Sequence, residues 1–144
     1  MTRDELLKIS HPLICTDQEV KALLNNQLIQ KPNFIRHKKD IPDDLLQPKY
    51  KKENIYYIKE GFYSTERCIK YYDNINIYYY RADASSEIKE YLKNNKQIWK
   101  TPVQMPLKAA RIFVKVVDSY KQKIKRPNGT WKWISIFERV VVDD

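Results

Sequence analysis

One carboxylate and a few basic residues of this 144-residue chain have the types and spacing from which a reactive site could be built. Glu60 follows a strand-like apolar segment and stands beside Lys59, so it is a candidate general acid or base. The same carboxylate could instead form a buried ion pair with Arg81 or Arg111 and hold a cleft together. We favour the ion pair, because no nucleophile or second titratable group stands at a fixed spacing from Glu60.

The second chemical feature is a concentration of positive charge between residues 96 and 126. The chain has a net charge of +9, and this tract alone contains nine basic residues and one acidic residue. An AT-rich coding sequence would raise the Lys content, but it would not gather the charge in one tract. We predict that Lys100, Lys108 and Arg111 contact phosphates and that Trp99 stacks on a base. The alternative, a solvated basic loop with Trp99 covering the core, stays open.

Metal and disulfide chemistry are not predicted. Cys15 and Cys68 are far apart and lie in apolar surroundings, so we expect two buried free thiols. His11 and His37 have no metal-ligand spacing. No segment approaches the roughly 20 apolar residues that span a bilayer, and the N-terminus lacks the apolar run of a signal peptide. We therefore expect a soluble cytoplasmic protein with no metal, no other cofactor and no membrane partner.

Short helices and a larger number of strands must position these residues. Capping boxes and a capping serine predict helices at 3–9, at 17–24 and after Ser85 or Ser86. In the last helix, Ile88, Tyr91 and Leu92 should face inward. Alternating and β-branched segments predict strands at 13–15, 54–59, 67–72, 75–82, 111–125 and 130–142. Asp73-Asn74 is a predicted turn, and Asn128-Gly129 predicts a long hairpin between the last two strands.

Two segments rich in proline are predicted to be loops. Residues 31–52 should be a loop with at most one helical turn at 42–46. Residues 98–110 should be an ordered extended loop, because two prolines remove backbone donors. Ile112, Val114 and Val116 should then pack inward. The pattern predicts an α+β fold, a small barrel or curled sheet with one main helix and short flanking helices.

Five segments of the chain come in the order of known family blocks. They read HPLICTDQEVKALLNNQ, KENIYYIKEGFY, YYYRAD, WKTPVQMPLKAARIFVKVVD and WKWISIFERV. They resemble the ASCH-domain proteins carried by phages and cover most of residues 11–142. The resemblance implies a PUA-like β-barrel, a fold associated with RNA and modified bases. It divides the chain into an N-terminal extension, residues 1–10, and a single domain, residues 11–144.

The departures from the family pattern concern catalysis. Some ASCH relatives hydrolyse N-acetylcytidine with a Lys and a Thr of a G-R-K-T-x-T motif and a Glu further on. Here Asn26 stands at the glycine position, Leu28 at the Lys position and Lys31 at the later Thr position. Leu28 cannot act as a nucleophile or base, so the motif's chemistry is lost unless Lys31 substitutes. Gln104 replaces the family's His, and the acidic helix that follows the corresponding strand in relatives is missing.

The resulting hypothesis is a non-catalytic PUA-like module of phage-like origin that binds nucleic acid, RNA rather than DNA, with Glu60 as a structural acid of the cleft. The predicted nucleic-acid-binding residues are Lys31, Arg36, Lys59, Tyr80, Arg81, Trp99, Lys100, Gln104, Lys108, Arg111, Lys121, Lys123 and Lys125. The alternative is a phage-encoded inhibitor that binds a host protein with the same cleft or the basic hairpin. A modified-nucleoside amidohydrolase is the third hypothesis.

Overall fold

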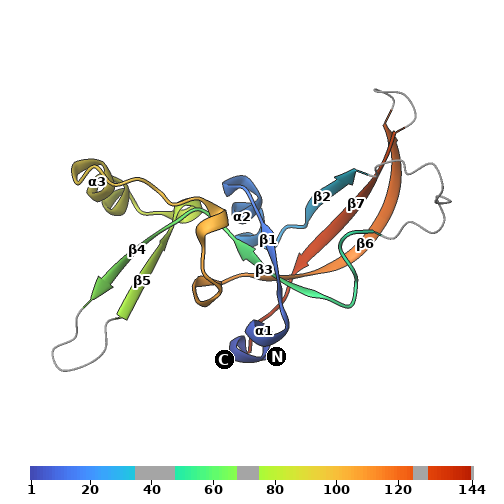
Figure 1. The fold of residues 1–144 in the computed structure, drawn as a ribbon, viewed down its shortest axis with the longest axis horizontal. Helices are drawn as coiled ribbons and strands as arrows, with labels where there is room; N and C mark the ends of the chain where they lie inside the picture. The colour runs from blue at the N-terminus through green and yellow to red at the C-terminus, as the bar shows by residue number, and fades with distance from the viewer. Residues whose placement is uncertain (35–47, 68–74, 125–129, 144) are drawn as a thin grey trace.

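The computed structural model describes residues 1–34, 48–67, 75–124 and 130–143, and it has a mixed α+β fold (Figure 1). The helices are α1 (Arg3–Ile9), α2 (Asp17–Leu24) and α3 (Ser86–Asn94). The strands are β1 (His11–Ile14), β2 (Ile29–Phe34), β3 (Ile55–Lys59), β4 (Phe62–Arg67), β5 (Ile75–Tyr80), β6 (Phe113–Ile124) and β7 (Thr130–Arg139). Three 3₁₀ turns are η2 (Arg81–Asp83), η3 (Pro102–Gln104) and η4 (Leu107–Ala109). The α+β class predicted from the sequence is confirmed.

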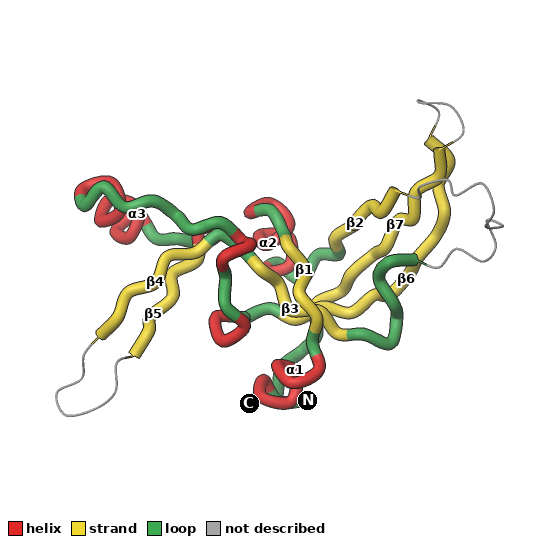
Figure 2. Tube along the Cα trace, in the orientation of Figure 1, coloured by secondary structure: helices red, strands yellow, loops and turns green. Residues whose placement is uncertain are grey.

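Five strands form one sheet in the order β1-β3-β6-β7-β2, so β6 is its central strand (Figure 2). β1 runs parallel to β3, and the other neighbours are antiparallel. The predicted pairing of the last two strands is confirmed by β6 and β7. Among the described residues, the edge strands β1 and β2 are not paired with each other, so this sheet is open. The ammonium of Lys31 spans the two edges, because it donates to the Ile14 carbonyl over 2.7 Å.

A separate two-stranded ribbon, β4 with β5, extends away from the five-stranded sheet, and α3 lies beside it (Figure 1). β4 begins at Phe62, ahead of the strand that the sequence predicts from residue 67. The polar segment Ser-Thr-Glu-Arg hides this strand from pattern analysis, and direct pairing with β5 compensates for its low apolarity. Tyr91 is 48% exposed, so the prediction that it faces inward with Leu92 is wrong.

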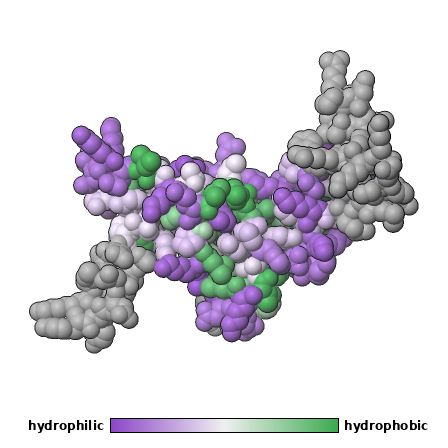
Figure 3. All heavy atoms as spheres, viewed as in Figure 1, coloured by the Kyte–Doolittle hydropathy of each residue, from purple (hydrophilic) through white to green (hydrophobic). Residues whose placement is uncertain are grey.

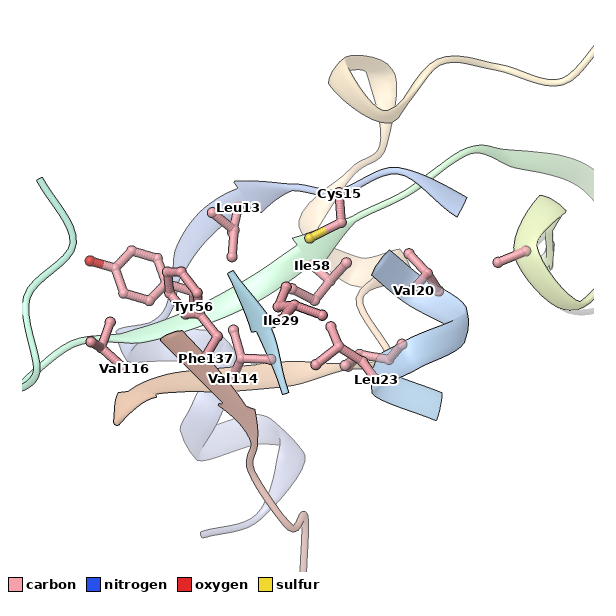
Figure 4. Packing of buried hydrophobic residues seen from close by; sticks show 12 residues of the cluster. Leu13, Cys15, Val20, Leu23, Ile29, Tyr56, Ile58, Val114, Val116 and Phe137 are labelled. Carbon is pink, nitrogen blue, oxygen red and sulfur yellow. The ribbon is translucent and has the colours of Figure 1, made fainter. Parts of the chain in front are cut away.

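Every strand of the five-stranded sheet sends side chains into one hydrophobic cluster, which α2 covers (Figure 4). Examples from the strands are Leu13, Ile58 and Phe137, and α2 contributes Val20 and Leu23. The predicted inward packing of the three aliphatic residues at 112, 114 and 116 is confirmed, since each is at most 5% exposed. Successive side chains of β6 alternate between faces, so Phe113 leaves this cluster and enters a second one.

The second cluster joins α1 and the segment before β6 to the opposite face of the sheet. Leu6 of α1 is 0% exposed and packs in one cluster with Phe62, Met105 and Phe113. The helix begins where the sequence predicts, because the Thr2 hydroxyl accepts the Glu5 backbone N–H. α1 therefore contributes to the core although it precedes the segment that resembles the ASCH family.

One loop prediction is wrong in part. Residues 31–34 belong to β2 and pair with β7, although Pro32 argues for a loop. The strand tolerates Pro32 because β2 is an edge strand, where a missing backbone N–H breaks no ladder bond on its open side. The predicted helical turn at 42–46 and both predicted turns, Asp73-Asn74 and Asn128-Gly129, lie outside the described residues.

Candidate functional site

Residues 98–110, which we call the Met-Pro tract, lead from α3 to the central strand β6. The tract is fastened at its start, where the backbones of Lys100 and Phe62 exchange two hydrogen bonds of 2.7 and 3.2 Å. It is fastened again by Met105, which is 2% exposed, and by the buried Ala109 and Ala110. The 3₁₀ turns η3 and η4 interrupt the tract without a regular α-helix, as its prolines predict. The remaining side chains of the tract are therefore displayed from an ordered backbone.

Glu60 stands where the tract meets β3, and it is 0% exposed. The Arg111 guanidinium donates to both of its oxygens, over 2.8 Å to Oε1 and 3.1 Å to Oε2. Burial raises the pKa of Glu60, and the hydrogen bonds from Arg111 offset that rise only in part. The structure thus pairs Glu60 with one of the two arginines that the sequence offers as partners. Both carboxylate oxygens are occupied, which leaves this acid poorly placed for proton transfer.

Arg111 is held from two further sides. Its guanidinium also donates to both oxygens of Asp83, over 2.8 and 2.9 Å, and its Cζ lies 4.0 Å from the centroid of the Tyr80 ring. These hydrogen bonds lower the pKa of Asp83. Burial alone would lower the pKa of Arg111, but its bonds to Glu60 and Asp83 raise it overall. The Tyr80 hydroxyl donates to the Ala109 carbonyl, so Tyr80 is fixed as well.

A second arginine is paired nearby. Arg81 Nε donates to Asp17 Oδ2 over 2.7 Å, and the Arg81 backbone N–H donates to the Gly61 carbonyl over 2.9 Å. A Cβ atom at Gly61 would lie 2.9 Å from Arg81 Cζ, closer than van der Waals contact allows. Gly61 therefore gives the guanidinium its place. Arg81 bridges β5 to α2 rather than offering its charge to solvent.

Two predicted lysines are likewise engaged inside the molecule. Lys31 donates to Glu19 Oε1 over 2.7 Å in addition to the β1 carbonyl, and Lys59 donates to the Val103 carbonyl over 2.9 Å. Cys15 is buried, and burial raises its pKa to about 12 although Lys31 lowers it. The thiol is therefore protonated at neutral pH and is no nucleophile.

Lys100 and Lys108 of the Met-Pro tract are exposed, and neither makes an ion pair within the described part of the chain. Trp99 beside them is half-buried. Gln104 is exposed, but its Oε1 accepts the Thr101 backbone N–H over 3.1 Å and caps η3. Hydrophilic side chains dominate the visible face of the molecule, with smaller apolar areas between them (Figure 3). The tract thus presents free ammonium groups next to an indole.

The basic hairpin departs from its prediction. Lys121 is half-buried, and its ammonium lies 5.4 Å from the centroid of the Trp133 ring, so the prediction that it is solvated is wrong. Trp133 lies opposite Lys121 in the register of β6 and β7, which brings the two side chains together. The side chain of Lys123, and Lys125 and Arg36 entirely, lie outside the described residues.

Sequence reasoning misses two carboxylates of this site. Asp83 follows Arg81 by two residues in a segment that resembles the ASCH family, and that position is the signal that could have identified it. Asp17 gives no such signal, because an acidic residue in the first turn of a helix is explained by the helix dipole alone. Its pairing with Arg81 joins segments 64 residues apart in the chain.

In the part of the chain that the structure describes, no group of three or more His, Cys, Asp or Glu side chains is arranged to hold a metal ion. None of the described helices has the length and apolar character that crossing a membrane requires. Comparison of the chain with protein-family models, with curated proteins and with solved structures gives no significant match. Geometry and charge alone therefore carry the functional argument.

Proposed function

We propose that the chain is a non-catalytic module that binds single-stranded nucleic acid, RNA in preference to DNA, through the Met-Pro tract. The observation that carries the proposal is the contrast between two groups of basic residues. Lys31, Arg81 and Arg111 are each paired with a carboxylate, whereas Lys100 and Lys108 are exposed without one among the described residues. Free ammonium groups on an ordered backbone are what phosphate contacts require.

Charge supports the same surface. Residues 96 to 126 contain nine basic residues and one acidic residue. The acidic residue, Asp118, caps its own neighbour through a 2.8 Å hydrogen bond to the Ser119 backbone N–H. Lys96, just before the tract, is exposed as well. Trp99 supplies a ring that can stack on a base, and stacking tolerates any sequence. A single strand fits better than a duplex, because bases must be unstacked to reach an indole.

The finer fold assignment belongs to the same proposal. We infer that the five-stranded sheet is a PUA-like barrel in which the described strands leave one seam open between β1 and β2. Two observations support this inference. All five strands enclose one cluster, and Lys31 bridges the seam by its bond to the Ile14 carbonyl. The association of PUA-like folds with RNA is the reason for preferring RNA to DNA as the ligand.

The experiment compares two matched pairs of substitutions. Lys100→Gln with Lys108→Gln removes the free charges of the tract, and Lys89→Gln with Lys93→Gln removes two exposed charges from α3. Each lost phosphate contact changes log affinity by about 0.7 per decade of salt, so the tract variant should bind a fluorescent RNA strand about 25-fold more weakly at 0.1 M salt. The α3 variant should bind like the wild type. Equal weakening by both variants would mean that only net charge matters and would overturn the proposal.

A second candidate function rests on a different property of the same tract. Ile98, Val103 and Leu107 are 83%, 66% and 41% exposed, and apolar groups gathered on one surface segment are typical of protein-binding sites. In that case the chain binds a host protein and the lysines only steer association. Val103→Asp then abolishes complex formation in nuclease-treated lysate, whereas RNA binding keeps its affinity.

A further inference from the structure

A pocket of about 320 Å³ lies where the two ends of the described chain meet. Three arginines line it, Arg3 from α1, Arg111 before β6 and Arg139 at the end of β7, together with Asn26, Phe113 and residues 140–142. The amino group of Met1 lies 2.7 Å from Asp143 Oδ2, and the Val140 N–H donates to the Phe113 carbonyl over 2.7 Å. These contacts hold α1 against the C-terminal segment, and Figure 1 shows the two termini side by side. The lysines of the Met-Pro tract do not line this pocket.

Two of the three guanidinium groups lack a carboxylate partner among the described residues. Arg3 donates only to main-chain carbonyls, over 2.7 Å to Lys108 and 2.9 Å to Ala110. Arg139 is half-buried and makes no hydrogen bond or ion pair with any described residue. Arg111 alone is balanced, by its two carboxylates. A half-buried charge without a partner is costly, so an anion in this pocket would recover that cost.

Hydrogen-bond donors remain available for such an anion. A guanidinium carries five N–H donors. The Nη1 group of Arg3 makes no hydrogen bond with the described residues, and in Arg139 all five donors are in that condition. Arg111 uses Nη1 once, which leaves one of the two N–H groups on that atom. Planar guanidinium forks match the oxygens of a phosphate better than those of a halide or a single carbonyl.

We propose that this pocket binds a phosphate monoester. The two uncompensated guanidinium charges suit a dianion, whereas a backbone phosphodiester carries one charge and must leave the pocket in two directions. The volume stands near the lower limit of small-molecule sites, roughly 300 to 1,000 Å³, which leaves room for a mononucleotide and little more. Phe113 and residues 140–142 give the ligand's less polar part an apolar wall. The phosphate belongs either to a free mononucleotide or to the 5′ end of a strand.

The test is a calorimetric titration of the full chain in a buffer without phosphate. The probes are uridine 5′-monophosphate, uridine, and a short RNA strand with and without a 5′-phosphate. The wild type should bind the monophosphate saturably and should not bind uridine. Arg139→Gln should weaken monophosphate binding about tenfold or more, since one charge-assisted contact to phosphate is lost. Lys115→Gln, which changes an exposed residue of β6 outside the pocket, is the matched control and should have no effect.

Arg139→Lys keeps the charge but loses the fork, so it should bind more weakly than the wild type and more tightly than Arg139→Gln. A thermal melt of each variant shows whether the fold persists. A preference for the 5′-phosphorylated strand over the 5′-hydroxyl strand would identify a strand end as the source of the phosphate. Equal affinity for the two strands, with the monophosphate still bound, would identify a free nucleotide. Absence of monophosphate binding at millimolar concentration, or equal affinity of wild type and Arg139→Gln, would overturn the proposal. The lysine variants of the Met-Pro tract should leave monophosphate binding unchanged, so the pocket stands or falls apart from the proposed function.

Discussion

Replacing Glu60 by Gln tests whether the buried ion pair holds the site together. Glu60 is 0% exposed, and both of its oxygens accept from Arg111. Gln keeps one carbonyl oxygen for Arg111 Nη2, but it places an NH₂ group against the Arg111 Nε–H. The substitution therefore replaces one charge-assisted hydrogen bond by a contact between two donors in a buried place.

The magnitude follows from these two losses. A hydrogen bond to a charged group contributes about 1.5–3 kcal/mol, and a buried donor without a partner costs about 1–3 kcal/mol. Asp83 still balances Arg111, and the neutral amide carries no charge whose burial costs free energy, so the total stays near the low end. We expect the free energy of unfolding to fall by about 3 kcal/mol. In a domain of this size that is roughly 6–12 °C in Tm.

Urea unfolding followed by circular dichroism measures the change, with Asp83→Asn as the matched control. Asp83 binds the same guanidinium, but its side chain is 48% exposed, so its loss should cost at most about 1 kcal/mol. The pH dependence adds a sign. Because burial raises the folded-state pKa of Glu60, the stability of the wild type should fall as pH rises from the ordinary Glu range through that raised value. Glu60→Gln should remove this fall. Equal destabilisation by the two variants would refute the account of Glu60 as the buried anchor.

Three further outcomes are expected. Gly61→Ala should lower the free energy of unfolding by about 1–3 kcal/mol in urea titration, because its Cβ would lie 2.9 Å from Arg81 Cζ; unchanged stability would mean that the Arg81 guanidinium moves freely. In a Cys68→Ser background, Cys15 should resist iodoacetamide at pH 8 in the folded protein and react after unfolding, since its pKa is raised to about 12; fast labelling of the native protein would contradict the burial. N-acetylcytidine should not be hydrolysed, because Leu28 has no group that can act as nucleophile or base; turnover detected by chromatography would revive the enzyme hypothesis.

Local signals in the sequence predict the elements that are fixed by local contacts. The Thr16–Glu19 capping box marks the start of α2 because its two hydrogen bonds join residues three apart. The alternation of Ile112, Val114 and Val116 predicts the buried face of the central strand for the same reason. β2 is missed in part, because Pro32 is a loop signal in every context except an open sheet edge, and the edge is a property of the whole sheet.

The candidate site is harder to predict, because its pairings join distant segments. Glu60 and Arg111 are 51 residues apart, and Arg111 and Asp83 are 28 apart. Residue type names these groups as candidates, but only the fold decides which of them neutralise one another. Arg81 and Arg111 therefore looked available in the sequence and are paired in the structure. The partners of Arg3 lie more than 100 residues away, so nothing local indicates that it lines a pocket.

The salt dependence of RNA binding tests the central claim most directly. The exposed Lys96, Lys100 and Lys108 give about three phosphate contacts, so log affinity of the wild type for a single strand should fall with log salt at a slope of roughly −2. The Lys100→Gln, Lys108→Gln variant should show a slope of roughly −0.7, while the Lys89→Gln, Lys93→Gln control keeps the wild-type slope. A flat response of the wild type, or one slope shared by all three proteins, would contradict nucleic-acid binding by the Met-Pro tract.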